Sequence, residues 1–189
     1  MSVDWNTDLL LQLTWHWENH VRPRLSGLTD EEYLWEPVAG CWSVRPRETA
    51  TTPMAVGGGD WVLDFALPEP KPAPVTTIAW RIGHLLVGVF GSRNASHFGG
   101  PPVDYPSYLY PSRAQDALDQ LDRMYDAWVA GVRALGPDDL ARPCGELHFE
   151  TSTMAALILH IHREVIHHCA EIALLRDLYA WRNAPVAQA

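Results

Sequence analysis

The feature that most constrains this chain is a long segment near its end, residues 153–176, that contains neither glycine nor proline. Such a run predicts a helix, with Ser152 as its N-cap. At about 100° per residue, five ionisable side chains of this helix share one sector about 100° wide. They are His160, Glu164, His167, His168 and Glu171. The apolar residues border this sector instead of lying opposite it, so the cluster is expected at the edge of the buried face.

A cluster of this kind favours metal binding. Ionisable groups that face a protein core are costly unless they are paired or bind a metal. A Glu and a His four residues apart can reach one ion from successive helical turns, much as His-x3-His does in helical zinc sites. Periodicity alone does not choose between Glu164 and His160, or between His168 and His167.

Three further segments carry apolar residues at helical spacing. They are residues 4–21, residues 75–97, and residues 113–135 with Ser112 as N-cap. Pro23 is expected to end or kink the first helix. Four long amphipathic helices predict an all-α fold, a four-helix bundle, in which metal sites are built from side chains on facing helices. The length suits a single domain over residues 1–189.

The connection between the first and second helices is long. A short helix is expected over residues 30–35, capped by Thr29. Residues 60–65 are expected to pair with residues 42–47 as a small β-hairpin. The segment 48–75 is rich in Thr, Pro and Gly. A long irregular insertion is often functional, which predicts a lid or a pocket rim, and the alternative is a variable surface loop.

Histidines also occur on the first two helices. His84 lies within the apolar face of the second helix. A lone histidine in such a place is usually a satisfied core residue, but the ionisable cluster elsewhere in the chain favours a metal ligand. His16 and His20 are four residues apart on the first helix. They form a second metal edge, a wall of the pocket, or a partly exposed polar stripe.

Composition excludes some classes of function. The chain is 47% hydrophobic and 20% charged, as expected of a globular protein, and its net charge is −9. A nucleic-acid partner is not expected, because phosphate contact needs a basic surface. No apolar run approaches the ~20 residues that cross a bilayer, and no signal peptide is evident. The tail from residue 183 onward is expected to fray.

Cysteine and arginine usage indicate the cellular compartment and the composition of the coding genome. Three cysteines are too few for a disulfide framework and match no zinc-binding spacing, so a cytoplasmic location is expected. The basic residues are 13 Arg and one Lys. Together with many Ala, Gly and Pro, this bias indicates a GC-rich coding genome.

Several short motifs occur together in a fixed order. Leu-Thr-Asp-Glu-Glu at 28–32 precedes Trp-Ser-Val at 42–44, then Trp-Arg-Ile-Gly-His-Leu-Leu at 80–86, and finally a Glu-x3-His motif begins the segment 164–176. In this order and spacing the chain resembles the DinB superfamily over nearly its whole length. The resemblance implies an up-down-down-up four-helix bundle.

The resemblance also implies a set of metal ligands. Many members of the family hold a divalent metal by one His of the second helix and a His-x3-His pair of the fourth. Here the first position of that pair is Glu164. A His/Glu/His set resembles the mycothiol-dependent maleylpyruvate isomerase branch, and it implies His84, Glu164 and His168 as ligands. Zinc is expected, although nickel, iron or manganese would suit the same N and O donors.

Three protein ligands leave a position open for water or substrate, as in catalytic zinc sites. The resemblance implies a thiol-dependent S-transferase or isomerase that uses mycothiol and acts on a small electrophilic molecule. Arg81 or Arg176 would orient the cofactor or substrate, and His160 or His167 would transfer protons. The ordinary interpretation of each arginine is a solvated or ion-paired side chain.

Other functions stay open. Glu164 could be an exposed residue that pairs locally with Arg163 or His168. The protein could be a non-catalytic, stress-induced bundle that binds a metal or a small molecule, its ion closed by His160 or His16. A metal-dependent hydrolase without a thiol is the third possibility. Relatives are often dimers, so a homodimer is expected.

Overall fold

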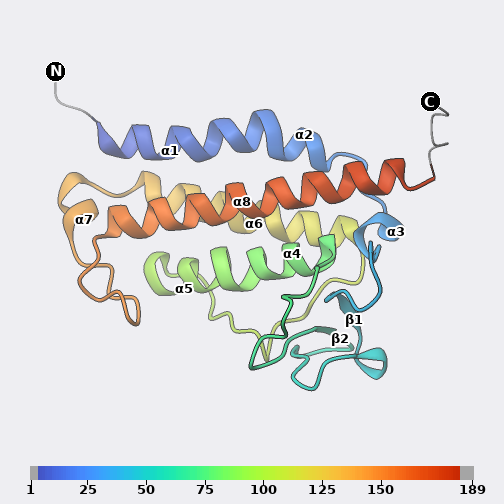
Figure 1. The fold of residues 1–189 in the computed structure, drawn as a ribbon. Helices are drawn as coiled ribbons and strands as arrows, with labels where there is room; N and C mark the ends of the chain where they lie inside the picture. Colours follow the sequence, from blue (N-terminus) through green and yellow to red (C-terminus); the bar gives the residue numbers. More distant parts are fainter. Residues whose placement is uncertain (1–3, 184–189) are drawn as a thin grey trace.

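The computed structural model describes residues 4–183 and contains four long helical rods packed as a bundle (Figure 1). The first rod is α1 (Trp5–His16), η1 (Trp17–Val21) and α2 (Arg22–Leu25), and the second is α4 (Ile78–His84), η3 (Leu85–Gly91) and α5 (Ser92–Phe98). The third rod is α6 (Ala114–Arg133) and the fourth is α8 (Met154–Trp181). The expected frayed tail lies, from residue 184 on, outside the described residues.

The direction of the rods confirms the predicted topology. In Figure 1 the first and fourth rods run from left to right, and the second and third run from right to left. This is the up-down-down-up order. The first and second rods each pack against both α6 and α8, from opposite sides. Each of these contacts forms a buried seam, which is the interface between two neighbouring rods. The seam between the second rod and α8 contains the candidate site.

Short polar side chains begin three of the rods. Asp4, Thr77 and Thr153 each accept a hydrogen bond from the backbone N–H three residues ahead, at 3.2 Å. Such caps satisfy one of the free N–H groups at a helix start. The prediction of Ser152 as the cap of the fourth helix was wrong by one residue, because the side chain of Thr153 makes the bond.

The third rod begins without a local cap. Its N-cap is Arg113, not Ser112 as predicted, and the Arg113 side chain makes no capping bond. Instead the carboxylate of Asp30 accepts a hydrogen bond from the N–H of Ala114 at 2.7 Å. Asp30 begins α3 (Asp30–Tyr33), the expected short helix, which Thr29 caps. The helix start is thus satisfied across the chain, which a local sequence pattern cannot show.

Pro23 does not end the first helix. The rod continues to Leu25 because it passes through the π-helical segment η1 just before the proline. There the N–H of Arg22 bonds to the carbonyl of Trp17, five residues back. A π-helical turn is wider than an α-helical turn, so it accommodates a proline ring that would otherwise clash with a carbonyl of the preceding turn.

The expected β-hairpin is confirmed, although its strands are shorter than predicted. β1 (Val44–Pro46) and β2 (Trp61–Leu63) pair antiparallel, with Val44 opposite Leu63. The fully buried carboxylate of Asp64 holds the hairpin base together. It accepts bonds from the Ser43 N–H at 3.0 Å and from the Arg45 guanidinium at 2.7 Å. A buried charge needs such partners, so this network holds the two strands of the hairpin together at their base.

The bundle core is mostly apolar, but it also contains buried polar side chains. His162 of α8 is buried, and its Nε2 accepts a hydrogen bond from the Trp128 indole N–H at 3.1 Å. Burial lowers the pKa of His162 to about 4, although a backbone interaction with Leu9 acts in the opposite direction. His162 is therefore neutral in the folded protein at pH 7. Among residues 4–183, no helix has the length and apolar character that crossing a membrane requires.

This histidine predicts an acid-sensitive fold. Between pH 6.5 and 4 the unfolded chain binds a proton at His162 that the folded chain does not, so stability falls as pH drops through this range. The pKa difference corresponds to about 3 kcal/mol of unfolding free energy. Urea unfolding at a series of pH values should give a flatter acid limb for His162→Gln than for the parent. Parallel limbs would contradict the assignment.

Candidate metal centre

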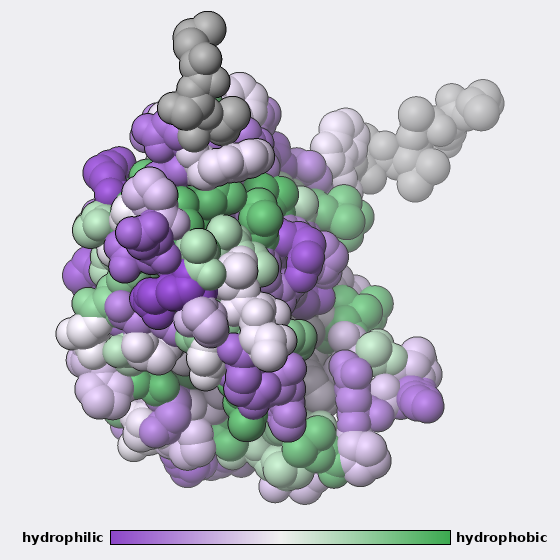
Figure 2. Space-filling view, turned by 90° about the vertical axis from the view of Figure 1, so that its left-hand side faces the viewer, coloured by the Kyte–Doolittle hydropathy of each residue, from purple (hydrophilic) through white to green (hydrophobic). Residues whose placement is uncertain are grey.

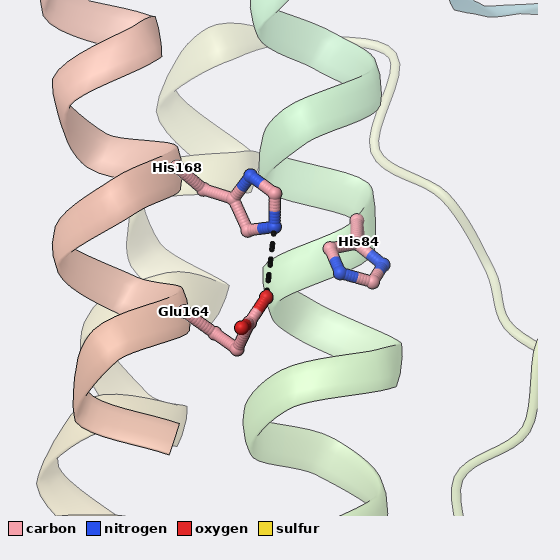
Figure 3. Close-up of side chains that lie close together, drawn as sticks. All are labelled: His84, Glu164 and His168. Atoms are coloured by element: carbon pink, nitrogen blue, oxygen red, sulfur yellow. Dashed lines mark ion pairs between the residues drawn. The ribbon is translucent and has the colours of Figure 1, made fainter. Parts of the chain in front are cut away.

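The three residues implied as metal ligands come together between the second rod and α8. His84 is the last residue of α4, and Glu164 and His168 lie one turn apart on α8. One ligand atom from each lies within 4.8 Å of the other two. Figure 3 shows Glu164 and His168 projecting from their helix toward the His84 ring on the facing helix. Two elements far apart in the sequence thus supply one compact N/O cluster.

His168 is oriented by a neighbouring carboxylate. Its Nδ1 lies 2.8 Å from Glu171 Oε2, while its Nε2 lies 3.5 Å from Glu164 Oε2. A carboxylate only accepts, and the contact with Glu171 is the shorter of the two, so Nδ1 donates the ring proton to Glu171 and Nε2 keeps its lone pair. That lone pair faces the cluster. A histidine held by a carboxylate in this way is the usual arrangement around protein-bound metals.

Arg81 supports the same histidine from behind. Its guanidinium lies 3.0 Å from Glu171 Oε1 and 3.4 Å from His168 Nδ1. Arg81 therefore holds Glu171, and Glu171 holds His168. The ordinary interpretation of Arg81 as an ion-paired side chain describes this contact, and the pairing has a positioning role that the sequence pattern did not reveal.

His84 is fixed by two aromatic residues. Its ring stacks on Trp80 with centroids 5.6 Å apart and planes 15° apart, and its Nδ1 lies 2.8 Å from the Tyr105 hydroxyl. Trp80 in turn donates its indole N–H to the Asp64 carbonyl at 2.9 Å. The hairpin insertion thus braces the helix that carries His84. Tyr105 comes from the connection between the second and third rods, and sequence reasoning missed its role.

Gly88 provides the space in which these side chains meet. A Cβ atom there would lie 2.1 Å from the Tyr105 hydroxyl and 3.0 Å from the His84 ring. Gly88 follows His84 by four residues, so it lies one turn along the same face. A glycine four residues after His84 was the one feature of the sequence that could indicate a bulky side chain close to the His84 ring.

Both imidazoles are neutral at pH 7. Burial, followed by the positive potential of His168, Arg81 and Arg93, lowers the pKa of His84 to about 4. Burial also lowers the pKa of His168, against the opposing effect of Glu171. The two rings pack perpendicular to each other, with centroids 4.9 Å apart. Neutral imidazoles are the form that binds metal, so no proton has to leave before an ion enters.

A second group of possible ligands overlaps the first. His167, His168 and Glu171 also offer atoms within 4.8 Å of one another. The side chain of His167 is 62% exposed, and all three residues come from one helix. Glu171 is already engaged by Arg81 and His168. The first group is the better site because its ligands converge from two facing helices and its carboxylate is less committed.

The remaining candidate residues lie outside the cluster. Arg176 pairs with Glu32 at 2.6 Å and donates to backbone carbonyls near the end of the first rod, so it ties α8 to α3. His16 and His20 line a separate hollow beside Cys169. Among the described residues neither joins a group of ligands within 4.8 Å. His160 stays close, with Nδ1 3.7 Å from Glu164 Oε1.

Comparison with known proteins identifies the family. The sequence model of the DinB superfamily matches residues 12–172. The chain belongs to the DinB superfamily. Divalent-metal binding is general in this superfamily, and the cluster of His84, Glu164 and His168 is where the DinB fold offers N and O ligands here. Neither a search of curated proteins nor a search of solved structures gave a match.

The packing at Gly88 gives a test of the site's geometry. Gly88→Ala should destabilise the protein by about 1–3 kcal/mol, because the added methyl group overlaps the Tyr105 hydroxyl. Removing that hydroxyl as well, in Gly88→Ala/Tyr105→Phe, should restore part of the loss. Urea unfolding of both variants and of Tyr105→Phe completes the cycle.

Gly136→Ala is the matched control, since a Cβ there meets its nearest neighbour, Asp139 Oδ2, at an ordinary 3.6 Å. Additive effects of the two changes at the site would show that Gly88 and Tyr105 do not meet as described.

Proposed function

We propose that His84, Glu164 and His168 hold one divalent ion, zinc foremost, and that the protein is a thiol-dependent S-transferase or isomerase of a small electrophile. The observation that carries this proposal is the convergence of three ligand atoms within 4.8 Å from two facing helices. Its support is the neutrality and fixed orientation of both imidazoles. A side chain held this way loses little freedom when an ion binds.

The donor set fits a catalytic site. Two imidazole nitrogens and one carboxylate oxygen are the composition of zinc sites that keep a fourth position open. A zinc ion held there would lower the pKa of a bound thiol and so supply a thiolate nucleophile at neutral pH. The surrounding residues of the chain orient the ligands. Glu171 holds the His168 ring, Tyr105 holds the His84 ring, and Arg81 holds Glu171. Mycothiol is the proposed thiol.

His160 is the better of the two proton-transfer candidates. The Arg163 guanidinium lies 2.7 Å from His160 Nδ1, and because guanidinium only donates, Nδ1 accepts and the ring proton sits on Nε2. His160 also borders Glu164, whereas His167 points to Glu171 at 3.5 Å on the other side of His168. We assign His160 the transfer of a proton to or from the substrate.

A homodimer is part of the proposal. Large apolar side chains stay exposed on the outer faces of the first rod and α8, among them Trp5, Trp15, Leu174 and Trp181. Figure 2 shows further apolar side chains gathered at the end of the bundle where α1 begins. Exposed apolar surface of this kind marks association sites. Sedimentation equilibrium of the full chain measures its molecular mass in solution and so tests whether it forms a homodimer.

Metal content tests the site. Protein purified without a polyhistidine tag should carry about one zinc ion per chain by elemental analysis, as a three-ligand site predicts. His84→Ala, Glu164→Ala and His168→Ala should each lose it. His167→Ala is the matched control, because His167 belongs only to the overlapping group. Loss in His167→Ala with retention in His84→Ala would move the site to that group.

Cobalt substitution tests the chemistry. The cobalt-loaded protein should gain a near-ultraviolet thiolate-to-metal absorption band when mycothiol is added, and Glu164→Ala should not. Absence of the band in a fully loaded protein would contradict the thiol-dependent reaction. A loaded protein that instead hydrolyses ester substrates without a thiol would support the hydrolase alternative.

A further inference from the structure

A pocket of about 290 Å³ adjoins the candidate metal centre. It lies between α5, the first half of α8, and the connection from α7 (Pro137–Ala141) to α8. Its walls combine apolar groups, among them Cys144, Phe149 and Leu157, with Arg93 and Arg163. Ligand sites commonly have this mixture of an apolar body and a few convergent polar groups.

The charge of the lining favours an anion. The one carboxylate in the wall, Glu146, is already engaged, with its oxygens 3.3 Å from Arg93 Nη2 and 2.8 Å from His97 Nε2. The Nε of Arg93 is buried and has no hydrogen-bond partner among the described residues. Arg163 is mostly exposed and reaches the pocket from α8. Because Arg93 is itself a partner of Glu146, the net positive charge of the lining comes from Arg163.

The pocket and the metal centre share residues. His160 lines the pocket and lies 3.7 Å from Glu164 Oε1, and Arg163 Nε lies 3.8 Å from the same oxygen. Arg93 donates to the carbonyl of Gly88, the residue against which His84 and Tyr105 pack. A molecule in this pocket would therefore contact His160, which lies between the pocket and Glu164 of the ligand cluster.

The size of the pocket limits its occupant. At ~30 Å³ per water molecule, the space equals that of about ten waters. A single ring with a carboxylate fits this volume. The pocket is therefore suited to a small second substrate.

We infer that this pocket binds the electrophilic substrate, a small carboxylic acid with an apolar body, and that Arg163 receives its carboxylate while Arg93 holds Glu146 in the wall. This inference rests on the proposed function and names the substrate class of that site. A guanidinium matches a carboxylate in shape and charge. The apolar body lies against Phe149 and Leu157, which places the acid's reactive part toward His160 and Glu164.

Protection of Cys144 tests the inference without an activity assay. The probes are benzoate and its neutral analogue benzamide, added to the full chain with and without zinc. Alkylation by iodoacetamide is followed separately at Cys144 and Cys41 by mass spectrometry. Benzoate should slow alkylation at Cys144, which lines the pocket, and leave Cys41 unchanged. Benzamide should need about tenfold higher concentration for the same protection, since it loses a charge-assisted bond.

Variants assign the anion contact. Arg163→Ala should weaken protection by benzoate about tenfold and leave that by benzamide unchanged. Arg142→Ala is the control, because Arg142 is exposed, lies in the same region of the chain and does not line the pocket. Arg93→Lys keeps the charge at this partly buried position and should weaken benzoate binding less than Arg163→Ala.

The outcomes separate this inference from the proposed function. A protein that loads zinc but shows equal protection by benzoate and benzamide, or none, overturns the pocket assignment and leaves the metal centre standing. Protection by benzoate that depends on Arg163 in a protein that binds no zinc supports the pocket and contradicts the proposed function. Slower alkylation at Cys41 as well as at Cys144 would overturn the pocket assignment, because this result would show that benzoate stabilises the whole protein.

Discussion

The contact between His84 and His168 is the interaction on which the rest of the site depends. Two imidazoles whose centroids lie 4.9 Å apart in a buried seam cannot both be charged at low cost. Burial lowers the pKa of both, and the neighbouring His168 lowers that of His84 further, so both rings are neutral at pH 7. The packing of the second rod against α8 therefore both stabilises the bundle and prepares two neutral ligands. Glu164 supplies the negative charge that favours a cation between the two histidines and this carboxylate.

Each ring is held by a different part of the chain. His168 is held within its own helix and from the facing one, through Glu171 and Arg81. His84 is held by Tyr105 from the second connection and by Trp80 of its own helix, whose indole donates to Asp64 at the hairpin base. These supports involve the two long connections, so segments that resemble surface loops in the sequence fix the geometry of the centre. Substitutions in such outer supports commonly reduce metal affinity by about 10- to 100-fold.

Much of this arrangement could be predicted from the sequence, because it depends on periodicity. Helical spacing placed Glu164 and His168 on one face of α8, and motif order indicated the bundle and His84. Local rules failed where a distant residue decided the outcome. Asp30 caps the third rod in place of Ser112, and a π-helical turn carries the first rod past Pro23. Tyr105 reaches His84 only because Gly88 leaves room, and contacts between a loop and a helix have no periodic signal.

Glu164 connects the two halves of the site electrostatically. Its Oε2 faces His168, and its Oε1 faces His160 and Arg163 at the edge of the pocket. While the carboxylate is free, it competes with any anion for Arg163. A cation between the ligands would neutralise that carboxylate and release the guanidinium toward the pocket. Binding of a cation at one end and of an acid at the other should thus favour each other, with the same free energy in both directions. Without the cation, the carboxylates of Glu164 and of the bound acid would compete for Arg163, so the acid should bind more weakly when the centre is empty.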